Sequence, residues 1–181
     1  MVMGVGNLMT LPIRVEYLAN PSYGINATNA QVALLTFFIP SAARVVSARI
    51  WGTLFDSMHF VTWRITINSF FIAGFLIYFN ATTLPLLALG SALFGFATGG
   101  GFVGWNLWIT KIAPSHKVSA YMSLHTMTTG LRGAVAPFLG YALLVQLSPS
   151  GIAWISSALV LASMAMFLVV KRHSRFDQDH G

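Results

Sequence analysis

The sequence predicts an all-α polytopic membrane protein with six transmembrane helices. Hydrophobic residues make up 56% of the chain and charged residues only 8%, whereas soluble domains carry roughly 25% charged residues. Long apolar stretches alternate with short polar linkers. Lys and Arg border every second linker, and the linkers between them hold none. This is the pattern of a chain that crosses a bilayer repeatedly with its basic linkers in the cytoplasm.

The six elements follow from length and apolar content, because a membrane-spanning helix needs about 20 mostly apolar residues. They are expected at about residues 1–18, 30–55, 65–79, 84–109, 118–147 and 151–170. The linkers between them carry Asn, Pro, Ser and Gly, which favour turns. A polar tail follows at residues 171–181. Both termini are expected in the cytoplasm, and the protein in the plasma membrane.

The first span is short and ends near Arg14 and Glu16. It also lacks the basic flank that the other cytoplasmic ends possess. We therefore expect the sequence to be a fragment, or one half of a larger assembly.

Composition excludes several kinds of site. The chain has no cysteine, so disulfides and thiolate chemistry are ruled out. The five histidines are scattered singly, without metal-ligand spacing, and we expect no metal or other cofactor. The net charge of +6 lies at membrane-edge linkers and not on a stretch with interleaved aromatics, so no nucleic-acid partner is expected.

The region around the linker between the second and third spans, expected in the cytoplasm, carries the first recognisable motif, with Gly52, Leu54, Asp56 and Arg64. It resembles the G-x-L-x-D loop motif of the major facilitator superfamily, although the usual second Gly and the dense basic cluster are absent. The resemblance implies that Asp56 neutralises the N-terminus of a helix in an opposite half and so latches a cytoplasmic gate.

The fifth span carries a second pattern, in which Gly133, Ala136, Pro137 and Gly140 provide a small-residue face and a helix-bending proline. It resembles the Gly-Pro-rich pattern of the same superfamily. The resemblance covers essentially the whole chain and implies the C-terminal half of a transporter, helices seven to twelve. Alternating access would move a small solute, with a missing or separate N-terminal six-helix half as partner. The third and sixth spans would then face lipid, and the second and fifth the other half.

An arginine inside a bilayer costs about 2.5–3.5 kcal/mol or more, so it usually lines a cavity or a protein contact. Arg132 lies near the middle of the fifth span. His125 lies two turns before it, and Thr129 lies between them, so the three form one polar stripe. Arg132 would bind an anionic group or a carboxylate, and His125 would carry a proton. The alternative is that both only fix helix contacts. Arg44, in the second span, is a further candidate.

The fourth span is rich in glycine. By the resemblance it would be a gating helix that lines the solute path. Candidate residues on it are Gly99, Gly100, Trp105 and Asn106, and Asn7 on the first span is expected to line the same path.

Two other functions stay open at this point. A six-helix subunit without transport would use Arg132 for protein contacts. A membrane-embedded enzyme is less favoured, because the spans hold neither a Gly-x-Ser-x-Gly motif nor clustered His and carboxylates. The sequence does not name the solute. Basic side chains without acidic ones in the spans favour an anionic or neutral solute, or carboxylates provided by the missing half.

Overall fold

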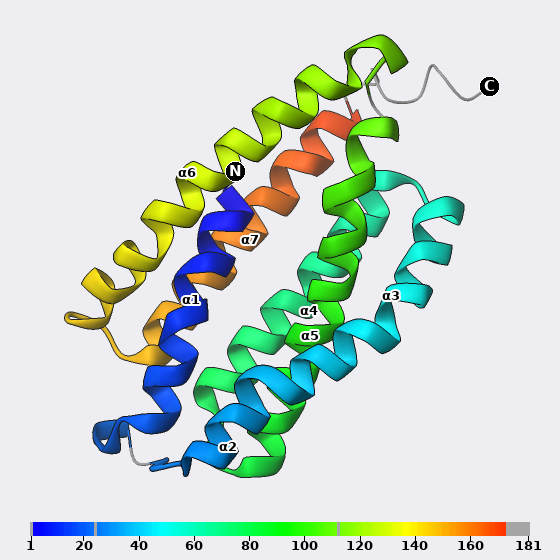
Figure 1. Ribbon diagram of the computed structural model, residues 1–181. Coiled ribbons are helices and arrows are strands. Elements are labelled where there is room, and N and C mark those ends of the chain that lie inside the picture. The colour runs from blue at the N-terminus through cyan, green and yellow to red at the C-terminus, as the bar shows by residue number, and fades with distance from the viewer. Residues whose placement is uncertain (1, 24, 112, 173–181) are drawn as a thin grey trace.

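A computed structural model describes residues 2–23, 25–111 and 113–172, and the regular structure in this part of the chain is helical (Figure 1). The main helices are α1 (Val2–Ala19), α3 (Ile39–Ser57), α4 (Phe60–Asn80), α5 (Leu84–Leu107), α6 (Val118–Leu144) and α7 (Pro149–Arg172). The shorter elements are η1 (Pro21–Tyr23), α2 (Asn29–Ala33), η2 (Leu34–Phe38), η3 (Trp108–Lys111) and η4 (Ser115–Lys117).

The helices are built for an apolar environment. Four segments are long and apolar enough to cross a membrane, namely Asn29–Ser57, Phe60–Asn80, Leu84–Trp105 and Pro149–Val169. Large apolar side chains also cover the outside of the bundle, including Met127 (73% exposed) and Phe138 (77% exposed) on α6. A soluble protein rarely exposes contiguous apolar surface on this scale. The predicted all-α membrane fold is thereby confirmed.

The helices pack as two triplets, and along the chain the members of one triplet lie between the first and second helices of the other. Helix α1 packs against α6 and α7, while α5 packs against α3 and α4, and α4 and α7 join the triplets (Figure 1). Exchanging α1 with α5, α3 with α6, and α4 with α7 leaves this set of contacts unchanged. The two sets of consecutive main helices are α1, α3 and α4, and then α5, α6 and α7. Because each set has an odd number of helices, the second set begins its path in the direction opposite to the first. The bundle therefore contains an inverted repeat of three helices.

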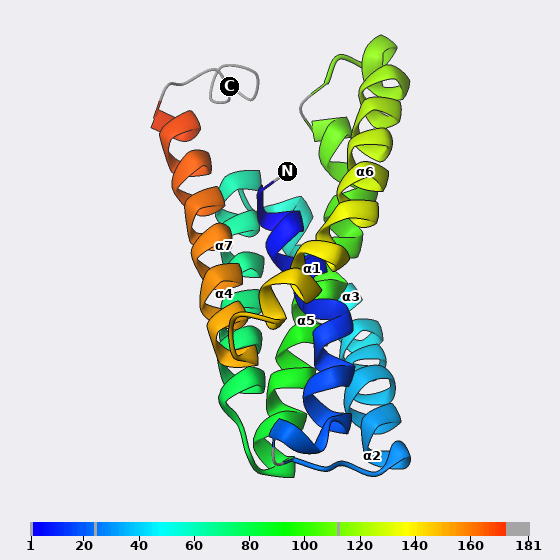
Figure 2. The same cartoon turned by 90° about the vertical axis from the view of Figure 1, so that its left-hand side faces the viewer.

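The last helices of the two sets, α4 and α7, lie together on one side of the bundle. Figure 2 shows α4 and α7 together at the left, with α3 and α6 at the opposite side. Helices α4 and α7 correspond to the third and sixth predicted spans.

Helix α3 is preceded by a wide helical turn. The N–H of Ile39 donates to the carbonyl of Leu34, five residues back, which is π-helical geometry. Pro40 follows directly, and its ring has no N–H and would clash with the carbonyl four residues earlier. One extra residue in the turn relieves this conflict. The segment Asn29–Ser57 is thus one continuous span with a local widening ahead of Pro40.

Helices α3, α4 and α5 are held together by tryptophans. The indole Nε1 of Trp51 donates to the carbonyl of Phe96 at 2.7 Å, and Nε1 of Trp63 donates to the carbonyl of Trp51 at 3.3 Å. Both indoles are almost fully buried. Close approach of α3 and α5 requires glycine on α5, because a Cβ at Gly99 would meet Ser47 Oγ and the Arg44 carbonyl.

Candidate functional site

The polar stripe predicted on α6 faces the first turns of α1. The guanidinium of Arg132 lies directly against Gly4, where a Cβ would overlap its Cζ, Nη1 and Nε atoms. The same guanidinium lies 5.9 Å from the ring centroid of Trp105 on α5, within cation–π range. Arg132 thus lies between α1 and α5, and its buried Nε has no hydrogen-bond partner among the described residues.

Arg64 reaches the same place from α4. Helix α4 begins at Phe60, capped by His59, whose Nδ1 accepts from the N–H of Val61 at 3.2 Å. The sequence pattern predicts Arg64 in a linker before a span at residues 65–79, whereas the structure places it inside the helix. Its Nη2 donates to Sδ of Met3, the residue before Gly4, at 2.8 Å.

His125 completes what we call the arginine–histidine cluster, defined as Arg64, His125 and Arg132. The ring centroid of His125 lies 4.4 Å from that of Trp105 and 5.2 Å from that of Trp108. Buried polar atoms without a partner among the described residues also belong to its neighbours on these helices: Asn7 Oδ1, Trp108 Nε1 and Thr129 Oγ1.

No carboxylate balances this cluster in the part of the chain that the structure describes. The two acidic residues in the described part of the chain are Glu16 and Asp56. Glu16 lies at the far end of α1, where it accepts a hydrogen bond from Asn20 Nδ2 at 2.7 Å. Asp56 is exposed on α3 and makes no ion pair with any described residue. The arginines of the cluster therefore have no acidic partner among the described residues.

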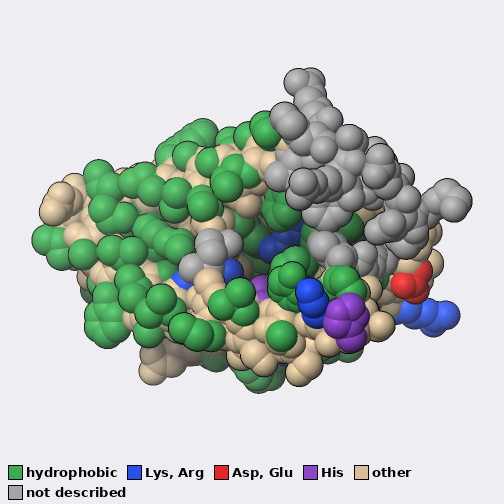
Figure 3. Space-filling model, turned by 90° about the horizontal axis from the view of Figure 1, so that it is seen from above, with side chains coloured by type: hydrophobic (Ala, Val, Ile, Leu, Met, Phe, Trp, Pro, Cys, Tyr) green, Lys and Arg blue, Asp and Glu red, His purple; other side chains and the backbone are tan. Residues whose placement is uncertain are grey.

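Viewed from the end of the bundle at which α1 begins, the surface is hollowed near its centre, and Lys or Arg side chains are visible inside the hollow (Figure 3). An anion would thus meet positive charge below the rim and not only at the outer surface.

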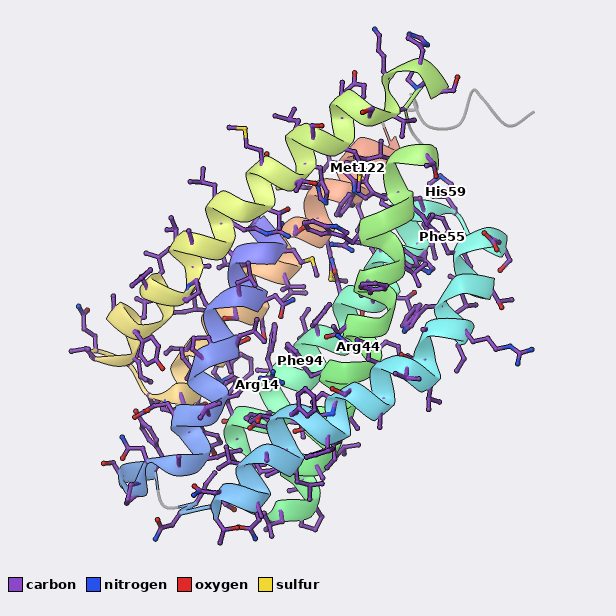
Figure 4. The ribbon with its side chains drawn as sticks, in the orientation of Figure 1. Arg14, Arg44, Phe55, His59, Phe94 and Met122 are labelled. Atoms are coloured by element: carbon purple, nitrogen blue, oxygen red, sulfur yellow. The ribbon has the colours of Figure 1, made fainter. Side chains whose placement is uncertain are left out.

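The other predicted residues divide into buried and exposed groups. Gly99 and Gly100 lie at helix contacts, Gly100 against Ile67 and Trp51. Gly140 lies against the backbone carbonyl of Met9. Gly52 and Gly133 have open space where a side chain would stand, so the expected small-residue face includes Gly140 and the buried Ala136 but not Gly133. Leu54 and Pro137 are half-buried, and Arg44 is exposed on α3 (Figure 4). The side chain of Asn106 lies outside the described residues.

Arg14 is a buried cation that was not predicted as a site residue, because the sequence pattern places it at the end of a span. It is only 7% exposed. Its Cζ lies 4.0 Å from the ring centroid of Phe94 on α5 (Figure 4). A signal was present in the spacing, because Met3, Asn7, Thr10 and Arg14 recur at intervals of four, three and four residues and so share one face of a helix.

Comparison with known proteins agrees with this architecture. The family model described as Major Facilitator Superfamily matches residues 1–179. No curated protein and no solved structure gave a significant match. The chain therefore belongs to the major facilitator superfamily of membrane transport proteins, whose members generally transport small solutes and are not enzymes.

Proposed function

We propose that this chain is the C-terminal six-helix half of a secondary transporter, comprising helices seven to twelve, and that it moves a small anionic solute by alternating access. One observation carries the anionic assignment. Arg64 and Arg132 converge on the consecutive residues Met3 and Gly4 without an acidic partner in the described chain. Two cations without an acidic partner favour a ligand that brings its own negative charge.

Each side chain of the cluster has a distinct role in this proposal. Arg132 donates hydrogen bonds to the anion through its unpartnered Nε. Arg64 adds a second positive charge from α4. His125 Nε2 is buried and unpartnered, so the ring can donate to the solute or carry a proton with it. Trp105 restricts Arg132 and His125 from one side by ring contact.

Alternating access requires a second bundle that rocks against this one about the solute site. The exposed face of α3 and α6 would meet that bundle, and Asp56 would latch the two at the cytoplasmic side. The glycines of α5, with Gly99 and Gly100 at its contacts, allow this helix to slide during the change. Both termini would lie in the cytoplasm, and the membrane would be the plasma membrane.

The half-transporter part of the proposal is tested on the DNA. The regions next to the Met1 codon should encode six further spans, with a stronger Gly-x-Leu-x-Asp motif, in frame or in an adjacent gene. Their absence would contradict a split or truncated transporter and favour a membrane subunit without transport.

The anion site is tested on the purified chain in lipid nanodiscs by its apparent unfolding temperature. Acetate, lactate, benzoate, phosphate and sulfate are compared at constant ionic strength, because a ligand that binds only the folded state stabilises it by mass action. At least one anion should raise the temperature in a saturable way. Arg132→Met should abolish the rise, and Arg49→Met, which removes an exposed charge, should retain it. No saturable rise with any anion, or equal loss in both variants, would overturn the assignment.

A further inference from the structure

Arg14 is a buried cation that the arginine–histidine cluster does not use. Its guanidinium packs on one face of the Phe94 ring, and its Nε and Nη1 atoms are buried without hydrogen-bond partners among the described residues. Tyr78 lies beside it, but the hydroxyl of Tyr78 donates to the backbone carbonyl of Arg14 at 3.3 Å and leaves the guanidinium unsatisfied.

Neither of two nearby polar residues compensates the charge of Arg14. Glu16 lies two residues later on α1, and its carboxylate accepts from Asn20. Ser91 lies on α5 one turn before Phe94. It is fully buried, and its Oγ has no partner in the described chain. Buried polar groups are rarely left without a hydrogen-bond partner in native proteins. Here the guanidinium of Arg14 and the hydroxyl of Ser91 both lack one among the described residues.

A polar face of α1 connects Arg14 to the arginine–histidine cluster. Met3, Asn7, Thr10 and Arg14 fall within about 60° of one another on a helix of 3.6 residues per turn. Met3 accepts from Arg64, Asn7 Oδ1 is buried and unpartnered, and Thr10 is fully buried. Gly4 and Arg14 are ten residues apart, a rise of about 15 Å along the helix axis.

We propose that Arg14 is a second anion-binding station on the solute path, reached from the arginine–histidine cluster along this face of α1. The inference rests on the proposed function, because it assumes the same anionic solute. The ligand it fits is a small monoanion such as a carboxylate, since a single guanidinium with one face covered by Phe94 offers its remaining N–H groups to one charged group. The solute passes from Arg132 and Arg64 to Arg14 as the bundle changes state.

The chain contains no cysteine, so a single Ser91→Cys substitution, which replaces Oγ by Sγ, reports on the surroundings of Arg14. The full chain in membranes is treated with an anionic methanethiosulfonate, the sulfonatoethyl reagent, and with its cationic trimethylammonioethyl counterpart. The modification rate with each reagent is divided by the rate at which the same reagent modifies a free thiol in solution. We expect the anionic reagent to be preferred roughly ten-fold, as one unscreened positive charge nearby would produce.

Three further variants make the result specific. Arg14→Met should remove the preference at position 91, Arg14→Lys should keep it, and Arg49→Met, which removes an exposed charge, should leave it unchanged. A separate Thr129→Cys substitution reports on the arginine–histidine cluster. The preference for the anionic reagent at position 129 should depend on Arg132 and not on Arg14.

The outcomes separate the two proposals. A preference at position 129 without one at position 91, or no modification of position 91 by either reagent, overturns the second station and leaves the anion site at Arg132 intact. A preference at position 91 that survives Arg14→Met also overturns it. No preference at either position contradicts the anionic solute itself.

Discussion

The guanidinium of Arg132 on α6 lies directly against Gly4 on α1, and any side chain at position 4 would occupy the space that it fills. Gly4 therefore sets how closely this cation approaches α1. The obstructing group is the far end of a flexible side chain and not backbone, so the conflict is resolved by moving the guanidinium and not the helices.

The first prediction concerns Gly4→Ala. The substitution should leave the free energy of unfolding within about 0.5 kcal/mol of the parent, while the displaced guanidinium weakens anion binding by about ten-fold, or ~1.4 kcal/mol. Titration of the stabilising anion against the apparent unfolding temperature measures both quantities. Gly133→Ala, with open space around it, is the control. Unchanged anion affinity in Gly4→Ala would show that the position of Arg132 does not matter for binding.

The second prediction concerns the contact between α1 and α6 at Gly140. A Cβ at this position would stand 3.2 Å from Cδ1 of Ile13 and closer still to the Met9 carbonyl. Backbone cannot move aside as a flexible side chain does, so Gly140→Ala should destabilise the chain by about 1–3 kcal/mol. Gly133→Ala should be neutral or slightly stabilising, because alanine favours helix. Thermal unfolding followed by helix circular dichroism compares the two, and equal stability would contradict this helix contact.

The third prediction concerns Trp51, which joins α3 to α5. Trp51→Phe removes the 2.7 Å hydrogen bond to the Phe96 carbonyl and part of a buried ring that packs edge-on to Trp63 at 6.0 Å. The expected loss is about 1–3 kcal/mol. Trp154→Phe is the matched control, because Trp154 is 60% exposed and its change should cost little. The experiment is the same unfolding measurement, and similar losses in both variants would exclude a special role for Trp51.

The fourth prediction concerns the hydrogen bond that joins α4 to α7 at one end of the bundle. Ser150 Oγ donates to Asn80 Oδ1 at 2.7 Å, and Asn80 Nδ2 donates to the Leu76 carbonyl. A double-mutant cycle with Asn80→Ala and Ser150→Ala should give a coupling energy of about 0.5–1.5 kcal/mol. A second cycle, pairing Ser150→Ala with Thr53→Ala at the other end of the bundle, should give a value near zero. Equal coupling in both cycles would mean that the measured term is not this bond.

Composition and apolar runs were enough to predict a helical membrane protein, since both follow from the properties of single residues summed over a window. The family resemblance rested on the loop motif from Gly52 to Arg64 and on the Gly-Pro-rich pattern from Gly133 to Gly140, and the family is confirmed. The identification of this chain as helices seven to twelve stays a prediction, as does the role of each site residue.

The sequence did not predict the surroundings of Arg64 and Arg14. Arg64 stands at the edge of an apolar run, where a charge is ordinarily assigned to the linker, and its contact with Met3 exists only because α1 crosses α4 there. Arg14 was expected near the end of the first span, but its burial could not be predicted, since the ring on which it rests, that of Phe94, lies 80 positions later in the chain. The widened turn before Pro40 follows from a local conflict that proline signals without specifying how the backbone relieves it.

The order of the two helix triplets along the chain has a consequence for biosynthesis. Of the helices described here α1 is synthesised first, yet the helices that cover it, α6 and α7, are synthesised last. The aromatic ring on which Arg14 rests also arrives only with α5. Until α4 and α5 are made, the polar face of α1 lacks Arg64 and Phe94, which it contacts in the folded bundle. A substitution in α6 such as Gly140→Ala would disturb the packing of a helix synthesised over a hundred residues earlier.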